Sequence, residues 1–373
     1  MSRFPPSGST PEAGSALHLV KASVRALAPY TLAAPRARRK LNQNEAPGDL
    51  PPELKRRIAD RLLAVPWHRY PEFSPGALLE RIAARHRWVA DGVLVGNGSN
   101  EVIQATLAVM VGEGDAVVAP TPTFSLYRLI TGVMGGRYLP VPLDDGFAFD
   151  VDRLIAVARR ERARVIVLNS PNNPTGSALP PDGVERVLQA TDAFVVADEA
   201  YQEFGGPTAV DLLPVAPRLA VMRTFSKAMG MAGLRFGYGL MHPEVAREVA
   251  KAKLPYNVNL VTLAAAEAAL DCLPLFEERV RAVVAERERT LARLAAIPGL
   301  VAYPSAANFF LVRCGTVPAR EVFRRLLDEH GILVRDVSGA AGLEECLRIS
   351  VGDADDMAAV AAALERIFRP PEP

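Results

Sequence analysis

Four short polar segments of the sequence could each contribute to a binding or catalytic site. They are residues 96–100 (Gly-Asn-Gly-Ser-Asn), 169–176 (Asn-Ser-Pro-Asn-Asn-Pro-Thr-Gly), 198–201 (Asp-Glu-Ala-Tyr) and 224–227 (Thr-Phe-Ser-Lys). In the first segment, two glycines allow the backbone to approach a ligand closely. The free N–H groups of Ser99 and Asn100 at the start of a helix would favour a phosphate. The same residues are also good helix N-caps, so this segment alone leaves both interpretations open.

The other three segments carry amides, a carboxylate and an amine. Residues 169–176 hold three asparagines and two prolines, which indicate a rigid loop. Asp198 follows an apolar run, so its carboxylate is expected to face a crevice at the end of a strand. Lys227 lies beside Ser226 in a glycine-rich stretch that also contains Arg235. Taken alone, this lysine could equally be an ordinary surface residue.

Several common catalytic motifs are missing from the sequence. It contains no GxxxxGK[ST], no HExxH and no GxSxG. Its five histidines are scattered, and its three cysteines show no CxxC spacing. We therefore predict neither a metal site nor a histidine-based triad, and no dithiol redox centre.

Helices and strands alternate from about residue 77 onward, and they carry the polar segments. We predict strands at 92–95, 116–119, 136–140, 164–168, 193–197, 219–223 and 237–241, and helices at 53–64, 78–86, 101–111, 127–134, 151–160 and 181–190. Pro120 is expected to end the strand 116–119. This alternation predicts an α/β fold with a mostly parallel sheet covered by helices. The polar segments follow strand ends, where open parallel sheets bind ligands.

The last third of the chain has a different pattern. Residues 264–294 are expected to form one long helix, followed by strands at 309–312 and 347–351 and helices at 319–330 and 355–367. This predicts a smaller α+β domain. We expect an N-terminal tail and arm at 1–45, a large domain at 46–270, and a small domain at 271–373 with the N-terminal arm packing nearby.

Composition and charge exclude several classes of protein. Hydrophobic residues make up 49% and charged residues 23%, and 43 basic against 42 acidic residues give a net charge of +1. This is globular composition without a polybasic surface for nucleic acid or membranes. No apolar run approaches the ~18 residues of a membrane span, and residues 1–15 lack the apolar core of a secretory signal. We expect a soluble cytoplasmic protein.

The order and spacing of the four segments are more specific than any one of them. Asp198 precedes Lys227 by 29 residues (227 − 198), and Arg235 follows it by 8 (235 − 227). In these features the chain, from about residue 24 onward, resembles the fold-type I pyridoxal-phosphate aminotransferases. The resemblance narrows to the histidinol-phosphate aminotransferase family through residues 24–30 (VRALAPY), 41–47 (LNQNEAP), 69–71 (RYP), 96–101 (GNGSNE), 334–336 (VRD) and 347–349 (LRI).

The resemblance implies pyridoxal 5′-phosphate as the cofactor, bound by the large domain. Lys227 is expected to form a Schiff base with it and to move the α-proton of the substrate. Asp198 is expected to pair with the pyridine nitrogen, and Tyr201 and Asn173 with the ring oxygen O3′. The phosphate would be held by Gly98, Ser99, Asn100, Thr224, Ser226 and Arg235. Phe124 matches the aromatic residue that stacks on the cofactor, although simple core packing would also explain it.

The resemblance also implies a homodimer and a substrate. Tyr70 matches a tyrosine that reaches the cofactor phosphate of the neighbouring subunit. Arg348 matches the arginine that binds the α-carboxylate of an amino-acid substrate, and Arg335 and Tyr30 match positions near the distal phosphate of the substrate. The predicted reaction transfers an amino group between histidinol phosphate and 2-oxoglutarate, with glutamate as the product, in histidine biosynthesis.

Other reactions use the same scaffold. An aromatic amino-acid aminotransferase is the nearest alternative, and a lyase similar to the threonine-phosphate decarboxylases is another. A pyridoxal-phosphate-binding transcriptional regulator would need a DNA-binding module in front of the fold. Only about two dozen residues precede the matching part of the chain, so this third alternative is not favoured.

Overall fold

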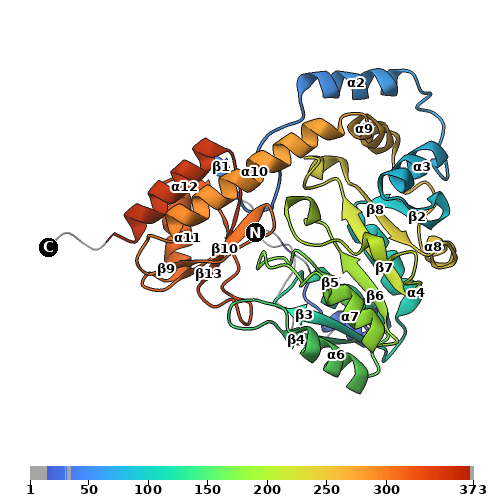
Figure 1. Ribbon diagram of the computed structural model, residues 1–373, viewed down its shortest axis with the longest axis horizontal. Helices are drawn as coiled ribbons and strands as arrows, with labels where there is room; N and C mark the ends of the chain where they lie inside the picture. Colours follow the sequence, from blue (N-terminus) through green and yellow to red (C-terminus); the bar gives the residue numbers. More distant parts are fainter. Residues whose placement is uncertain (1–14, 30, 32–34, 370–373) are drawn as a thin grey trace.

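The fold is built on two β-sheets of unequal size (Figure 1). The structure is a computed structural model and describes residues 15–29, 31 and 35–369. The larger sheet has the strand order β2-β8-β7-β6-β5-β3-β4. Its strands are β2 (Val93–Asn97), β3 (Ala116–Thr121), β4 (Arg137–Pro142), β5 (Val165–Asn169), β6 (Phe194–Asp198), β7 (Leu219–Thr224) and β8 (Phe236–Met241). β8 runs opposite to the direction that the other strands of this sheet share, so the predicted mostly parallel sheet is confirmed.

The direction of β8 follows from the connection that precedes it. Parallel strands need a crossover of about a dozen residues or more, usually with a helix. The connection from β7 to β8 spans residues 225–235 and contains only a short 3₁₀ turn at Ala232–Leu234. The chain therefore returns directly beside β7 in the opposite direction. This short connection carries Lys227.

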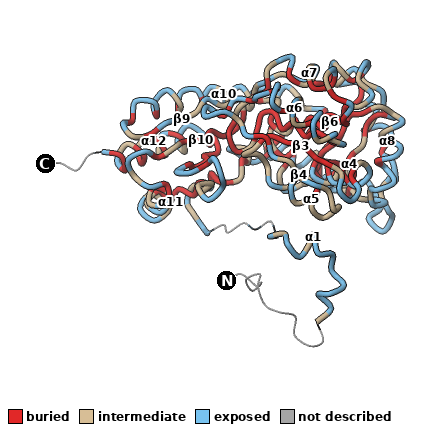
Figure 2. Tube along the Cα trace, turned by 90° about the horizontal axis from the view of Figure 1, so that it is seen from below, coloured by how far each residue is buried: buried red, intermediate tan, exposed pale blue. Residues whose placement is uncertain are grey.

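Helices cover the larger sheet, and apolar side chains fill both of its faces. The helices are α2 (Pro52–Leu63), α3 (Gly76–Arg85), α4 (Ser99–Met110), α5 (Leu126–Met134), α6 (Val151–Arg160), α7 (Gly183–Ala190), α8 (Pro243–Ala250) and α9 (Leu260–Leu270). Along β5, Ile166 and Leu168 belong to one core cluster, whereas Val165 and Val167 belong to another. Figure 2 shows buried residues along the strands and exposed residues on the outer surface. Burial on both faces explains why these strands are continuous apolar runs.

The smaller sheet is antiparallel, with the order β12-β13-β10-β9. Its strands are β9 (Leu300–Ala302), β10 (Phe309–Cys314), β12 (Arg335–Asp336) and β13 (Cys346–Ser350), accompanied by helices α10 (Leu273–Leu294), α11 (Ala319–Asp328) and α12 (Ala354–Ile367). A two-stranded parallel pair joins β1 (Arg39–Lys40) to β11 (Ile332–Leu333). The core of this region also includes Tyr201 and Phe204, so the predicted domain boundaries stay a prediction.

The predicted single helix at 264–294 was wrong. The structure has α9 ending at Leu270 and α10 beginning at Leu273, with Asp271 and Cys272 between them. Pro274 lies in the first turn of α10. Proline has no N–H to donate to α9 and clashes with a preceding helical turn, whereas the first turn of a new helix tolerates it.

The strand that Pro120 was expected to end continues to Thr121. The N–H of Arg164 donates to the carbonyl of Ala116. The backbone N–H and C=O groups of the even-numbered residues of β3 therefore point towards β5. Pairing of β3 with β5 stops at Val118 and Ile166, because Pro120 has no N–H to extend it. The backbone of Thr121 points towards β4 instead, and its carbonyl accepts from the N–H of Leu143. Hydrogen bonding between β3 and β4 therefore keeps β3 extended up to Thr121.

The N-terminal part contains a 3₁₀ turn at Ala16–Leu19 and the short helix α1 (Ala22–Arg25), and neither has a buried residue. Most of the predicted tail, residues 1–14, lies outside the described residues. No helix in the described part of the chain is both long and apolar enough to cross a membrane.

Candidate active site

Most of the side chains singled out in the sequence line one cavity of about 1040 Å³. The cavity lies at the carboxyl ends of the parallel strands and reaches the smaller sheet. From the predicted set it is lined by Ser99, Asn100, Phe124, Asn173, Asp198, Tyr201, Thr224, Ser226, Lys227, Arg235, Arg335 and Arg348. The residues of the larger sheet meet at one place because the carboxyl ends of its parallel strands share one edge. Arg335 and Arg348 reach the same cavity from the smaller antiparallel sheet.

Two of the predicted residues that the structure describes do not line this cavity. Gly98 lies next to the side chain of Arg235, which does line the cavity. Tyr70 is 78% exposed, and its ring stacks on that of Tyr256 with centroids 4.5 Å apart. Tyr30 lies outside the described residues, so its predicted role stays a prediction.

Two glycines shape an anion cradle at the start of α4. Gly98 has φ 81°, and a Cβ at this position would lie 2.5 Å from Nη2 of Arg235. A Cβ at Gly237 would lie 2.1 Å from the backbone nitrogen of Ser99. Because both side chains are absent, Arg235 and β8 pack closely against the helix N-terminus. Free N–H groups, the helix dipole and a guanidinium then converge on one point, which suits a phosphate.

Hydroxyl groups in the turn after β7 complete this cradle. Nη1 of Arg235 donates to Oγ of Ser226 at 3.1 Å. Oγ1 of Thr224 lies 3.0 Å from the same Oγ and accepts from the N–H of Ser226 at 3.1 Å. These contacts fix the orientation of the guanidinium and of the Ser226 hydroxyl, which is buried beside it.

Asp198 ends β6 as a buried carboxylate with neutral partners. Its Oδ2 accepts from the hydroxyl of Tyr127 at 2.6 Å, and its Oδ1 accepts from the N–H of Ala200 at 3.1 Å. Burial raises the pKa of Asp198, and these two hydrogen bonds oppose the rise. A buried carboxylate in such surroundings is well suited to bind a cationic group of a ligand. The sequence analysis missed Tyr127, because it lies within a helix and has no motif of its own.

Asparagine side chains fix the loop after β5. Nδ2 of Asn169 donates to the carbonyl of Asp198 at 3.1 Å, and Oδ1 of Asn169 accepts from the N–H of Asn173 at 2.9 Å. The side chain of Asn173 in turn accepts from Nη1 of Arg348. The loop that prolines and asparagines predicted to be rigid thus connects Asp198 to an arginine of the smaller sheet.

Lys227 lies partly buried against the segment after β1. Its Nζ donates to the carbonyls of Gln43 and Asn44, each at 3.1 Å, and lies 5.5 Å from the centroid of the Tyr201 ring. Nδ2 of Asn44 donates to the Tyr201 hydroxyl at 3.1 Å. Removal from water, followed by the charge of Arg348, lowers the pKa of Lys227 to about 7. A substantial fraction of this amine is therefore an uncharged nucleophile near neutral pH.

This shift predicts how the stability of the cofactor-free protein depends on pH. The lysine titrates near 7 in the folded protein and near 10.5 when unfolded. Between these pH values the unfolded chain binds more protons, so the free energy of unfolding rises with pH. Lys227→Met removes this dependence and should stabilise the cofactor-free protein at pH 7 by on the order of a few kcal/mol. Urea unfolding at pH 7 and pH 10 measures the difference, which should shrink at pH 10. A difference independent of pH would contradict the shifted pKa.

Two arginines face each other across the strands of the smaller sheet. Arg335 in β12 is the register partner of Arg348 in β13, and both line the cavity. Nη2 of Arg348 donates to the carbonyl of Asn42 at 2.8 Å, and its guanidinium lies over the ring of Phe309. Like charges directly opposite each other destabilise a sheet. Their presence on a cavity wall therefore indicates that the ligand is an anion.

Phe124 lines the cavity and packs edge-on against Tyr127, with centroids 5.6 Å apart. Its predicted stacking on the cofactor stays a prediction.

The described residues contain no group of three or more histidine, cysteine, aspartate or glutamate side chains that could hold a metal ion. The functional groups that line this cavity are an amine, carboxylates, amides, hydroxyls and guanidinium groups.

Comparison with known proteins assigns these features to a family. The profile described as "Aminotransferase class I and II" matches residues 39–364. A histidinol-phosphate aminotransferase from Chlorobaculum parvum is 40% identical over 314 residues, which are 84% of this chain and 88% of that protein. One from Chromobacterium violaceum is 38% identical over 352 residues, covering 94% of this chain and 98% of that protein.

A solved structure agrees with the sequence relatives. The crystal structure of histidinol-phosphate aminotransferase from Sinorhizobium meliloti, in complex with pyridoxal 5′-phosphate, superposes with a TM-score of 0.85. The two chains are 28% identical, and the match covers 96% of this chain and 99% of the other. The likeness therefore extends over both sheets.

Proposed function

Because the chain belongs to the histidinol-phosphate aminotransferase family of the class I and II aminotransferases, we propose that it transfers the amino group of histidinol phosphate to 2-oxoglutarate. Membership makes it a pyridoxal-phosphate-dependent transaminase, as the sequence predicted. The observation that carries the choice of substrate is the pair of arginines, Arg335 and Arg348, on the wall of the cavity.

The groups of the cavity fit pyridoxal phosphate. The N-terminus of α4, Arg235 and Ser226 supply the donors for its phosphate. Asp198, whose partners are a tyrosine hydroxyl and a backbone amide, supplies a negative charge for the protonated ring nitrogen. Lys227, with its pKa near 7, supplies the amine for the aldehyde. The phosphate, the ring nitrogen and the aldehyde of the cofactor are thus each matched by suitable groups of the protein.

When bound, the cofactor supplies an electron sink for the carbanion that forms at the α-carbon of the substrate. The protein supplies the proton transfers and the orientation. We assign to Nζ of Lys227 the removal of the α-proton, because an amine with a pKa near neutrality can both accept and return it. Asp198 keeps the ring nitrogen protonated, and Tyr201 and Asn173 hold the ring oxygen. Asn44 supports this arrangement through the Tyr201 hydroxyl.

The arginine pair suits the substrates of this reaction. Histidinol phosphate carries a phosphate, and 2-oxoglutarate carries two carboxylates. Arginine binds both kinds of anion through paired N–H donors. Arg348, fixed by Asn173 and the carbonyl of Asn42, lies close to the proposed reaction centre and suits the α-carboxylate. Arg335, opposite it, suits the distal phosphate.

This assignment predicts different effects for the two arginines. A charge-assisted contact to a phosphate contributes about 1.5–3 kcal/mol. Arg335→Ala should therefore lower kcat/KM for histidinol phosphate by about tenfold to a hundredfold. The same variant should barely change kcat/KM for phenylalanine, whose side chain has no anion. Arg348→Ala should affect 2-oxoglutarate most. Steady-state kinetics with both donors measures these effects.

Phenylalanine is the control substrate in this test. If the wild type prefers phenylalanine, or if Arg335→Ala weakens both donors equally, histidinol phosphate is not the substrate. The aromatic aminotransferase alternative would then be favoured. Release of CO₂ from threonine phosphate would favour the lyase alternative instead.

We further propose that the protein is a homodimer. Exposed apolar side chains gather where the end of α2 and the loop after it meet residues 254–261: Leu63, Val65, Trp67, Tyr70, Phe73, Leu254, Tyr256 and Val261. Tyr70 and Phe73 both contact the ring of Tyr256. An exposed apolar patch of this kind marks an interaction surface, and a second copy is the partner that we propose for it.

Oligomeric state tests this proposal directly. Sedimentation velocity of the wild type at micromolar concentration should give a species of twice the chain mass of 40.1 kDa. Trp67→Glu should shift it towards the monomer, whereas Val215→Glu, at another exposed apolar residue, should not. A monomeric wild type would contradict the proposal. The cytoplasmic location stays a prediction.

A further inference from the structure

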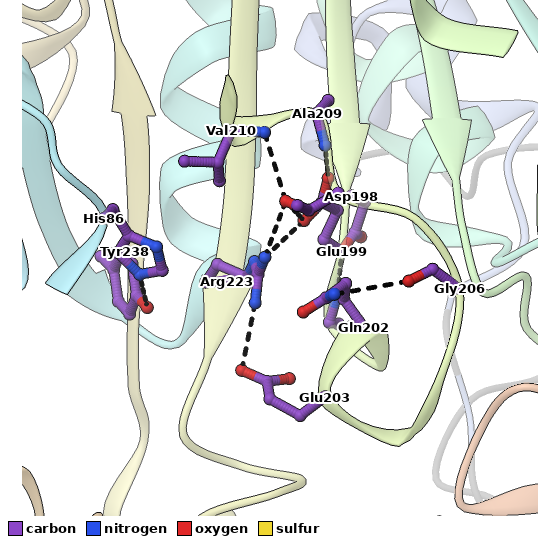
Figure 3. A network of polar contacts seen from close by, with 12 residues as sticks. His86, Asp198, Glu199, Gln202, Glu203, Gly206, Ala209, Val210, Arg223 and Tyr238 are labelled. Carbon is purple, nitrogen blue, oxygen red and sulfur yellow. Dashed lines mark hydrogen bonds and ion pairs between the residues drawn. The ribbon is translucent and has the colours of Figure 1, made fainter. Parts of the chain in front are cut away.

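Glu199 and Arg223 form a buried ion pair that none of the roles above uses. Nη2 of Arg223 lies 2.7 Å from Oε2 of Glu199, and both residues are at most 5% exposed. Figure 3 shows that Glu199 and Glu203 converge on Arg223 from neighbouring parts of the chain. Each partner of the pair is the chain neighbour of a residue of the proposed cofactor site: Glu199 follows Asp198, and Arg223 precedes Thr224.

The pair lies on the face of the large sheet opposite to the cavity. Side chains alternate between the two faces of a strand. Along β7, Leu219 and Val221 belong to one core cluster, whereas Ala220 and Met222 belong to the cluster on the other face. The side chain of Arg223 therefore lies on the same face of the sheet as Val221. Met222, Val196 and Tyr127 lie on the opposite face. Glu199 alternates with Asp198 in the same way.

The backbone ladder connects the two faces. Asp198 is the register partner of Met222, and the N–H of Glu199 donates to the carbonyl of Met222 at 3.0 Å. On the other side, the carbonyl of Asp198 accepts from the N–H of Ser170 at 3.0 Å. The Glu199–Arg223 contact thus joins the ends of β6 and β7 one residue beyond the last ladder pair. At this point strands commonly fray, because the hydrogen-bond ladder stops.

The contacts of Glu199 are directional and numerous. Its Oε1 accepts from the N–H of Ala209 at 2.6 Å, and its Oε2 accepts from the hydroxyl of Thr208 at 2.9 Å. Nη2 of Arg223 also donates to the Thr208 hydroxyl at 3.0 Å. Three hydrogen bonds and the ion pair itself thus fix the carboxylate and the guanidinium in one arrangement, which a pair of charges alone would not do.

The neighbouring strand β8 brings no second positive charge close to Arg223. Tyr238 is its register partner in β8, and the Tyr238 hydroxyl contacts Nε2 of His86 at 2.8 Å. Burial, followed by the charge of Arg223, lowers the pKa of His86 to about 3. The imidazole is therefore uncharged at neutral pH, and the charged groups in contact with Arg223 are the carboxylates of Glu199 and Glu203.

We propose that Glu199 and Arg223 are positioning residues that fix the carboxylate of Asp198 for the ring nitrogen of the cofactor. The side chain of Asp198 can keep its direction only if the backbone at the end of β6 does not twist. The ion pair holds the next residue of β6 to β7 from the far face. This inference rests on the proposed role of Asp198.

The test compares the effect of breaking the pair in the presence and absence of the Asp198 carboxylate. Glu199→Gln with Arg223→Met removes both charges of the pair together, so that Glu203, whose side chain is 16% exposed, is the one charged group that loses its partner. The new amide can still accept from the N–H of Ala209. The double variant is made in the wild type and in Asp198→Asn. Equilibrium dialysis of each holoenzyme, with absorbance at the cofactor band, gives the dissociation constant of pyridoxal phosphate.

A positioning role and a merely structural role predict different results. If the pair acts through Asp198, the double variant should weaken cofactor binding about tenfold or more in the wild type but less than about twofold in Asp198→Asn. Equal losses in both backgrounds, or no loss in either, would overturn the proposal. If the double variant does not fold, Arg223→Lys takes its place under the same criterion, because lysine keeps the charge but not the fork of donors.

Arg218→Met is the matched control. Arg218 precedes β7 at the other end of the same strands and donates to the carbonyls of Leu188, Thr191 and Ala193. Its loss should lower the melting temperature without changing the cofactor affinity. The experiment distinguishes the proposed role of Asp198 from the proposed role of the ion pair. If Asp198→Asn alone leaves the affinity unchanged, the proposed role of Asp198 is wrong. If Asp198→Asn weakens binding but the pair shows no coupling to it, only the positioning role is wrong.

Discussion

Replacing Lys227 with alanine should reduce turnover by at least about 10⁴-fold, because the amine of Lys227 has two functions in the proposed reaction. It binds the cofactor covalently, and it moves the proton at the substrate α-carbon. A general acid–base group alone contributes about 10² to 10⁴-fold. No other lysine lines this cavity among the described residues, so alanine leaves no amine to take over. The cofactor phosphate should still bind, since its donors come from α4, Ser226 and Arg235.

Borohydride reduction and peptide mapping check this result. In the wild type the reduced cofactor should be found on the peptide that contains Lys227, and in Lys227→Ala on no peptide. Lys253→Ala is the control, because burial also lowers the pKa of Lys253 but this lysine does not line the cavity. That variant should retain both turnover and labelling. An adduct on a different lysine would contradict the assignment of Lys227 and, with it, the alignment to the family.

Replacing Asp198 with asparagine should slow turnover by about 10²-fold or more. Asparagine has the same shape and can still accept from Tyr127, but it carries no negative charge to hold a proton on the ring nitrogen. The unprotonated ring would then accept electrons poorly. Single-turnover kinetics with saturating cofactor measures the proton-transfer step separately from binding.

A second carboxylate of the cavity serves as the control. Asp336 also lines the cavity, where its Oδ1 accepts from the N–H and hydroxyl of Ser338. Asp336→Asn should have a much smaller effect on the proton-transfer step. Turnover of Asp198→Asn close to that of the wild type would show that another group protonates the ring.

The sequence was sufficient for the local parts of the fold. The apolar run before Asp198 predicted a buried strand, because a strand covered on both faces excludes polar residues. Helix α6 was predicted with its observed bounds, Val151–Arg160, since Asp150 caps it and its apolar residues recur at helical spacing. The break at Asp271 and Cys272 was not predicted, because the residues on both sides have a helical composition. Pro274 was the residue that indicated the start of a new helix.

Much of the candidate site was also contained in the sequence. Gly98, Asp198, Lys227 and Arg235 were identified by their order and spacing, which reflect the positions of strand ends along the chain. Such residues can be recognised because each lies in a local motif. Their gathering in one cavity follows from a property of parallel sheets, whose strand ends point to the same edge.

The distant groups that support these residues could be found only in the folded chain. Tyr127 meets Asp198, the carbonyl of Asn44 meets Lys227, and Glu199 pairs with Arg223. None of these partners lies in the same local segment as the residue that it contacts. Their contacts depend on the register of neighbouring strands and on which side of a sheet is buried. The kinds of chemical groups, and the strand ends that carry them, could therefore be predicted from the sequence alone. The packing of the two sheets determined their protonation and their orientation, because both depend on the removal of water and on charges brought close by the fold.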